Sequence, residues 1–351
     1  MAATALPIAW TDAARERAFG AWLAAVAPRH RLNIASLRSA SSDASFRRYF
    51  RIDGAEASFV VMDAPPPLED VRPFIDVAAL LAGCGLNAPR VLEQDVARGF
   101  LLLTDLGTEL YLDALNEAVA NGRTAAADAL MRDAIAALIQ WQGGADAAVL
   151  PPYDEALLRR ELALFPEWCV GRERGVTWNA DEQALWQGTC DLLVASALAQ
   201  PQVAVHRDYM PRNLMVCAAN PGILDFQDAV RGPISYDMAS LLRDAFISWD
   251  EEQEIDWAVR YWQAARKTGL PVADDFGEFW RALEWMGLQR HLKVLGIFCR
   301  LKHRDAKPRY SADLPRFFGY AHKVAARYNP LRPFSRLLEP LMGATRLEAF
   351  Y

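Results

Sequence analysis

The chain of 351 residues lacks paired cysteines, long apolar runs and an excess of basic residues. Its five cysteines include no Cys-x-x-Cys pair, so the sequence predicts neither a disulfide framework nor a cysteine zinc site. Lys and Arg total 38 against 44 Asp and Glu, and this balance argues against a general nucleic-acid-binding protein. No stretch approaches the roughly 18 apolar residues of a membrane span.

The N-terminus also lacks the basic and apolar segments of a signal peptide, so we expect a cytoplasmic protein whose cysteines stay reduced. Hydrophobic residues make up 52% of the chain and charged residues 23%, a composition typical of folded globular proteins. The length predicts two domains or one bilobed unit.

Strand patterns are concentrated in the first third of the chain, and helical spacing dominates the rest. The sequence therefore predicts an α+β fold, with an N-terminal lobe over 1–105 and a mainly helical C-terminal lobe over 106–351. We expect strands at 46–52, 58–62, 90–94, 99–107, 214–217 and 222–226. We expect helices at 11–27 (capped by Thr11), 69–82, 124–142, 154–168, 180–199, 235–248, 251–268, 274–302 and 312–328.

One segment carries the spacing His-x-Asp-x-x-x-x-Asn, formed by His206, Asp208 and Asn213, and Asp225 follows twelve residues later. This spacing indicates phosphoryl transfer from ATP. One carboxylate, Asp208, would lie near the acceptor hydroxyl, while Asn213 and Asp225 would supply oxygen ligands to Mg²⁺. His206 would orient the loop. The alternative is a buried structural histidine next to unrelated surface acids.

The segment resembles the catalytic core of the aminoglycoside phosphotransferase and choline kinase family, whose pattern continues with Asp-Phe and then Gly-x-x-x-x-Asp. Here these are Asp225-Phe226 and Gly232 to Asp237. The resemblance implies a bilobal protein-kinase-like fold with ATP and Mg²⁺ as cofactors. It also implies that Asp208 is the catalytic base and that Asp237 supports the catalytic loop by accepting hydrogen bonds.

Four segments are similar in sequence to one group of enzymes within that family: 44–51, 60–67, 206–215 and 224–237. These are bacterial kinases that phosphorylate the anomeric C1 hydroxyl of N-acetylmuramate and N-acetylglucosamine in cell-wall sugar recycling. The resemblance implies a small amino-sugar substrate and a sugar-1-phosphate nucleotidyltransferase as the neighbouring enzyme. We expect a monomer, with no nucleic-acid or membrane partner.

At the nucleotide end, the 39–46 segment contains no glycine, so Ser41, Ser42 and Ser45 would contact phosphate oxygens together with Arg47. Leu103 and Asp105, in the connector between the lobes, would lie at the adenine. Kinases normally carry a lysine on the third strand, but no lysine precedes Lys267. We expect Arg47, Arg48 or Arg51 to replace it, with Glu69 as the partner glutamate. A non-catalytic nucleotide-binding module is the alternative.

The acceptor would bind in the helical lobe. The residues expected there are Gln227, Asp228, Arg243, Trp249, Trp285, Arg290 and His291. The basic stretch 290–309 suits an anionic acceptor, or it is a solvated helix face. The acidic stretch 249–256 suits a cationic acceptor, or it is an ordinary helix start. A kinase of an aminoglycoside, choline or homoserine is therefore the alternative enzyme.

Overall fold

The computed structural model describes residues 8, 10–41, 46–66, 68–219 and 221–343. Its internal contacts divide the chain into two compact units. The N-terminal unit comprises 1–110 and 215–228, and the helical unit comprises 111–214 and 229–351. Segment 215–228, which the sequence places in the C-terminal lobe, thus groups with the N-terminal unit. The lobe boundary at residue 105 stays a prediction.

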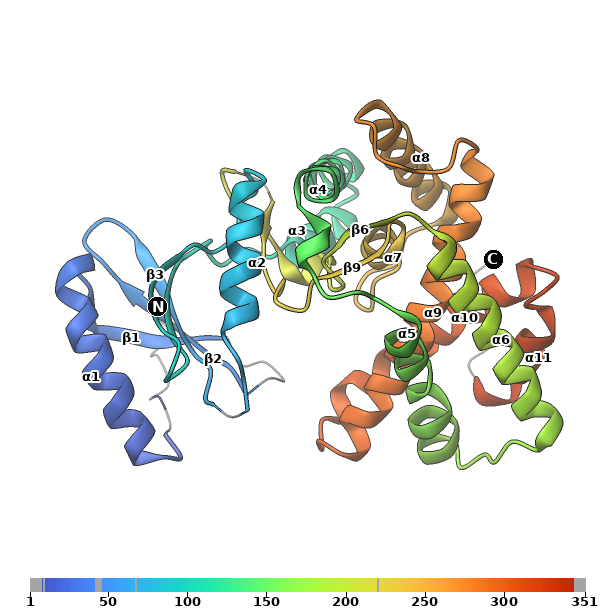
Figure 1. Ribbon diagram of the computed structural model, residues 1–351, viewed down its shortest axis with the longest axis horizontal. Helices are drawn as coiled ribbons and strands as arrows, with labels where there is room; N and C mark the ends of the chain where they lie inside the picture. The colour runs from blue at the N-terminus through green and yellow to red at the C-terminus, as the bar shows by residue number, and fades with distance from the viewer. Residues whose placement is uncertain (1–7, 9, 42–45, 67, 220, 344–351) are drawn as a thin grey trace. The chain divides into compact units, whose positions relative to one another are not determined.

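The N-terminal unit contains an antiparallel five-stranded sheet in the order β1-β2-β3-β5-β4 (Figure 1). Its strands are β1 (Asn33–Ser41), β2 (Arg48–Asp53), β3 (Ser58–Asp63), β4 (Val91–Asp95) and β5 (Phe100–Thr104). Helices α1 (Ala13–His30) and α2 (Arg72–Gly83) lie on opposite sides of the sheet. The strand β1 was not predicted, because its sequence is rich in small polar residues.

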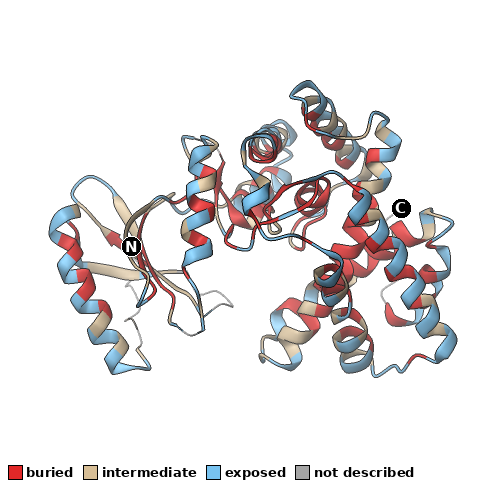
Figure 2. Ribbon diagram, in the orientation of Figure 1, coloured by how far each residue is buried: buried red, intermediate tan, exposed pale blue. Residues whose placement is uncertain are grey.

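One apolar face of α1 forms the core of this unit against the sheet (Figure 2). Phe19 is central, with its ring 5.3 Å from Phe50 and 5.5 Å from Phe100. The predicted cap at Thr11 is wrong, because Asp12 caps the helix. Its carboxylate accepts from the backbone N–H of the second and third residues that follow, at 2.8 and 3.2 Å, and a charged oxygen also suits the helix dipole.

The helical unit contains nine α-helices within its described residues, and it supports the predicted α+β class. They are α3 (Tyr111–Ala120), α4 (Thr124–Gly144), α5 (Glu155–Leu162), α6 (Ala180–Ala199), α7 (Tyr236–Leu242), α8 (Glu251–Lys267), α9 (Phe276–His303), α10 (Leu314–Arg327) and α11 (Arg332–Leu338). Strand β6 (Gln202–Val205) of this unit pairs with β9 (Val230–Pro233). The short pair β7 (Leu214–Met215) and β8 (Gly222–Ile223) begins at the last residue of 111–214, and β8 belongs to the N-terminal unit.

Two predicted helices differ from the structure for local reasons. The helix expected over 154–168 ends at Leu162, and a π-helix over Phe165–Glu173 follows. Pro166 has no N–H to continue α-helical hydrogen bonding. The helix expected over 235–248 ends at Leu242, where Arg243 leaves helical geometry. None of the described helices is long and apolar enough to cross a membrane.

Helix α9 is the central element of the helical unit and packs against the π-helix, α6, α7 and α10. Gly296 of α9 allows the helix backbone to lie very close to the backbone of Leu164. A Cβ atom at this position would lie 2.5 Å from the carbonyl carbon of Leu164, where no side chain fits. The backbone of α9 therefore lies directly against the start of the π-helix.

We predict that Gly296→Ala destabilises the protein by about 1–3 kcal/mol, because the added methyl group must displace backbone atoms. Gly188→Ala in α6 is the matched control. Nothing lies within 4 Å of the Cβ it would add, so it should stabilise the protein by roughly 0.5–1 kcal/mol through helix propensity. Urea unfolding of both variants measures the difference. Equal effects would contradict this account of the packing.

Candidate active site

The loop 206–213 is attached to the helical unit through Asp237, in the first turn of α7. The Asp237 carboxylate is fully buried and accepts the backbone N–H of His206 at 2.7 Å and of Arg207 at 3.0 Å. Burial raises the pKa of Asp237 to about 7, and the two N–H donors oppose that rise. These bonds fix the start of the loop.

Arg207 has a positive φ of 76°, an uncommon conformation for a residue with a side chain. Its guanidinium donates to Glu161 at 2.5 Å, and Lys293 lies 3.0 Å from the same carboxylate. Burial opposes ionisation of Glu161, but Lys293 and Arg207 outweigh it and lower its pKa to about 2. This buried ion cluster holds the strained residue in place.

Asp208 follows Arg207 and is half-buried. Its backbone N–H donates to Nδ1 of His206 at 3.3 Å, and its carbonyl accepts from Nδ2 of Asn213 at 2.9 Å. The side-chain amide of Asn213 thus closes the loop with its nitrogen, which orients its oxygen away from the Asp208 carbonyl. His206 is buried at 1% exposure, where it can orient the loop.

Asp225 belongs to the N-terminal unit, just after β8. It also has a positive φ, 60°, and its Oδ1 accepts from Nε2 of Gln227 at 2.9 Å. The Oε1 atom of Gln227 is buried and has no hydrogen-bond donor among the residues that the structure describes. Phe226 is fully buried against Phe74, with ring centroids 4.7 Å apart, and anchors this segment.

Each unit, taken by itself, carries oxygen ligands of the kind that a hard cation prefers. In the helical unit Asn213 offers an amide oxygen, and in the N-terminal unit Asp225 offers a carboxylate beside the unsatisfied oxygen of Gln227. No group of three His, Cys, Asp or Glu side chains that could hold a metal occurs in the described part of the chain. Few protein ligands are typical of Mg²⁺, which takes its other oxygens from water and nucleotide phosphates.

The three candidate arginines of the N-terminal unit bind different acids. Arg47 pairs with Glu69 at 2.9 Å, and both side chains are largely buried. Arg48 binds Asp63. Arg51 binds Asp105 at 2.5 Å. These ion pairs distinguish Arg47 as the arginine with a glutamate partner. Glu69 lies in the loop before α2, not on the helix as predicted, since α2 begins at Arg72.

Other predicted nucleotide residues are less informative. Ser42, Ser45 and the side chain of Ser41 lie outside the described residues. Leu103 is buried on β5, opposite Val60 of β3. The Asp105 carboxylate accepts from Arg51, from the Ser58 hydroxyl at 2.7 Å and from the backbone N–H of Gly107 at 3.0 Å. Its carboxylate is thus used within the unit, so a contact with adenine would have to come from its backbone.

Two of the predicted acceptor residues, Arg243 and His291, are almost completely buried and contact other side chains of the helical unit. Arg243 is 1% exposed, and its guanidinium donates to Glu254 and Glu284, both at 3.0 Å. His291 is fully buried against Phe317 and Tyr320. Burial, together with nearby Arg243 and Arg290, lowers the pKa of His291 well below its usual value.

The remaining acceptor candidates are divided between the helical unit, which contains Arg290, Trp249 and Trp285, and the N-terminal unit, which contains Asp228. Arg290 is 3% exposed and contacts the 206–213 loop, with Nη2 3.7 Å from the sulfur of Met210. Trp249 and Trp285 are half-buried, and their indole N–H groups have no acceptor among the described residues. Asp228 is exposed in the N-terminal unit, next to the buried Gln227.

Sequence reasoning missed Glu161 and Lys293. Glu161 lies 46 residues before Arg207, and helical spacing gives no sign of this contact. The only usable signal is indirect: an arginine next to a catalytic aspartate needs a buried carboxylate partner. Lys293 was included only in a general basic stretch.

Residues 36–276 match the phosphotransferase enzyme family. The N-acetylmuramate/N-acetylglucosamine kinase of Pseudomonas aeruginosa is 54% identical over 307 residues, which cover 88% of this chain and 89% of that protein. The protein of the same name from Pseudomonas putida is 53% identical over 311 residues, which cover 89% of this chain and 90% of that protein.

A solved structure shows the same fold at low identity. An aminoglycoside phosphotransferase bound to ADP matches with a TM-score of 0.55 and 16% identity, covering 87% of this chain and 96% of that chain. This likeness confirms the predicted protein-kinase-like α+β fold. With the family match over most of its length, the chain belongs to the phosphotransferase enzyme family.

Proposed function

We propose that the protein is an ATP-dependent kinase of N-acetylmuramate and N-acetylglucosamine that phosphorylates the anomeric C1 hydroxyl. The observation that carries this proposal is identity above one half, over about nine tenths of each chain, to two kinases of that name. We further propose that the enzyme acts in the cytoplasm as a monomer in cell-wall sugar recycling. A sugar-1-phosphate nucleotidyltransferase would use its product.

In the proposed reaction, the C1 oxygen attacks the γ-phosphorus of ATP as the bond to the β–γ bridging oxygen breaks. The hydroxyl proton passes to the Asp208 carboxylate, and ADP leaves with the bonding electron pair. Asn213 and Asp225 would hold Mg²⁺, which neutralises phosphate charge when bound. Asp237 and the Arg207–Glu161 contact hold Asp208 in position.

We assign phosphate binding in the N-terminal unit to Arg47. Its bond to Glu69 orients the guanidinium, as a glutamate orients the phosphate-binding lysine in protein kinases. Arg48 and Arg51 are poorer candidates because their carboxylate partners are almost completely buried, with side-chain exposures of 0% for Asp63 and 4% for Asp105, against 14% for Glu69.

The acceptor is tested by supplying ATP and Mg²⁺ with each sugar and with its methyl glycoside, and by measuring ADP release. Both free sugars should be consumed, whereas the glycosides, which have no C1 hydroxyl, should not be. Turnover of the glycosides would move the reaction to another hydroxyl. ADP release only with an aminoglycoside, choline or homoserine would mean that the natural acceptor is one of these compounds and not an amino sugar.

Asp208→Asn should lower kcat by about 10²-fold or more, since the variant cannot take the proton, while the Kd for ATP stays nearly constant. Steady-state ADP release and ATP titration measure the two quantities. Asp191→Asn, at an exposed ion pair on α6, is the control and should retain full activity. Unchanged kcat in Asp208→Asn would contradict the assigned base.

Arg47→Met should raise KM for ATP by about tenfold or more, because a charge-assisted contact to phosphate is lost. Arg47→Lys should restore part of the affinity. The control is Arg38→Met, which removes an exposed pair with Asp53 on the same sheet. An unchanged KM for ATP in Arg47→Met would mean that another group replaces the missing lysine.

Glu161→Gln should destabilise the protein at pH 7 by about 3 kcal/mol, because two buried cations lose their anion. The pKa of Glu161 is lowered from 4.5 to about 2 in the folded state. Its stabilising effect is therefore fully present above pH 4.5 and decreases as the pH falls toward 2. Urea unfolding at several pH values should show the variant and wild type converging below pH 4.5. A constant difference would refute this role.

A further inference from the structure

Two arginines from separate segments of the helical unit meet at one tyrosine. Arg309 is in the 3₁₀-helix Pro308–Asp313, which follows α9, and its Nη2 donates to the hydroxyl of Tyr310 at 2.9 Å. The side chain of Arg212, in the 206–213 loop, lies close enough to the same hydroxyl to lower the pKa of Tyr310. Two cationic groups therefore lie beside one neutral hydroxyl.

Aromatic rings hold both guanidinium groups in place. Tyr310 is 7% exposed, and its ring packs 5.2 Å from Phe298 of α9. The guanidinium of Arg309 lies 4.9 Å from the Tyr310 ring centroid, and that of Arg212 lies 5.3 Å from the Phe246 centroid. Stacked arginines lose less side-chain entropy when they bind an anion, so this pair is pre-organised.

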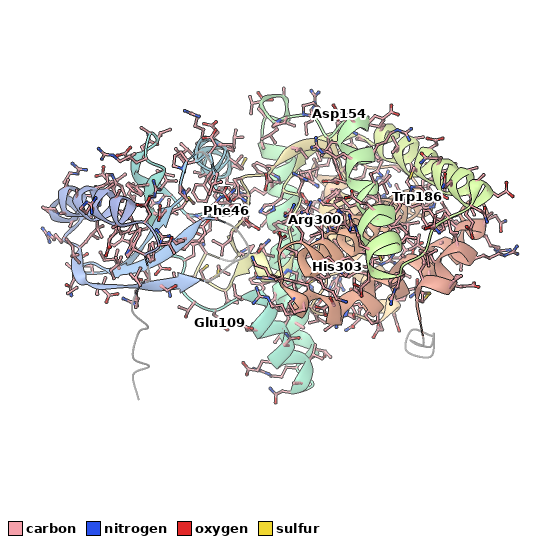
Figure 3. The ribbon with its side chains drawn as sticks, turned by 90° about the horizontal axis from the view of Figure 1, so that it is seen from below. Phe46, Glu109, Asp154, Trp186, Arg300 and His303 are labelled. Carbon is pink, nitrogen blue, oxygen red and sulfur yellow. The ribbon has the colours of Figure 1, made fainter. Side chains whose placement is uncertain are left out.

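Most neighbouring cations already have an acidic partner. Lys302 and His303 bind Glu173, and Arg304 binds Asp305. Figure 3 labels His303, together with Arg300, in the last turn of α9, where the chain approaches the 3₁₀-helix.

Arg309 differs from them. Among the residues that the structure describes, no carboxylate oxygen lies within 4 Å of its guanidinium, and the side chain is exposed. Tyr310 reports the resulting positive field: burial raises its pKa, but Arg309 and Arg212 outweigh this and lower it.

We propose that Arg309 and Arg212 form an anion subsite that binds the lactyl carboxylate of N-acetylmuramate. A carboxylate is the natural ligand of two converging guanidinium groups. Arg212 is four residues after Asp208 and directly precedes Asn213, so the subsite adjoins the loop that carries the proposed base. The lactyl group and the C1 hydroxyl belong to the same sugar ring. This inference rests on the proposed function.

The two proposed acceptors provide an internal test, since N-acetylglucosamine has no carboxylate. Arg309→Met should lower kcat/KM for N-acetylmuramate by about tenfold or more, mainly through KM. The values for N-acetylglucosamine and the KM for ATP should change less than about twofold, because this sugar has no carboxylate for Arg309 to bind and an exposed side chain contributes little otherwise. Arg309→Lys should restore part of the loss. The methyl ester of N-acetylmuramate should respond like N-acetylglucosamine.

Arg304→Met is the matched control, because Arg304 is an exposed arginine near the same helix end whose charge is paired with Asp305. It should leave both sugars unaffected. An equal loss for both sugars in Arg309→Met, a raised KM for ATP, or no change with N-acetylmuramate would each overturn the subsite. If the wild type consumed neither sugar, the proposed function itself would fail, so the two failures are distinguishable.

Discussion

The buried Asp237 carboxylate is the contact on which the arrangement of the 206–213 loop depends. It accepts hydrogen bonds from two successive backbone N–H groups, those of His206 and Arg207, and so fixes the position of the backbone just before Asp208. Arg207 adopts a left-handed conformation that costs free energy, and Glu161 holds its side chain in the interior. The strain and the buried charges are thus localised directly beside the residue to which we assign the chemistry.

The distribution of arginines explains how the chain can lack an N-terminal lysine. In the N-terminal unit, Arg48 and Arg51 hold the sheet together through Asp63 and Asp105, while Arg47 pairs with Glu69. Arg48 and Arg51 thus build structure, whereas Glu69 orients Arg47 as a glutamate orients the phosphate-binding lysine of protein kinases. In the helical unit, Arg304 is paired with Asp305, whereas no carboxylate of the described residues lies within 4 Å of the Arg309 guanidinium, so its charge is available for a ligand.

The motif residues could be located from the sequence because their spacing reflects chemistry within short segments. His206, Asp208 and Asn213 share one loop, and the hydrogen bonds among them are local. Helix α6 was predicted with its observed bounds, and Asn179 forms a capping box at its start, which is a local interaction.

Long-range contacts could not be predicted in this way. Arg243 was expected at the acceptor, but its charge is bound by Glu254 and Glu284, which lie 11 and 41 residues away. A single sequence does not indicate which distant acidic and basic residues pair with each other. The π-helix after α5 was missed for another reason, since Pro166 alone does not reveal how the broken hydrogen bonds are replaced.

The central claim is phosphoryl transfer to an anomeric hydroxyl, and ³¹P NMR tests it most directly. The purified protein would be incubated with ATP, Mg²⁺ and N-acetylmuramate or N-acetylglucosamine. We predict a new phosphomonoester resonance coupled to the anomeric proton, together with ADP. A product whose phosphorus couples to another sugar proton would contradict the regiochemistry, and ATP that stays intact with both sugars would contradict the acceptor.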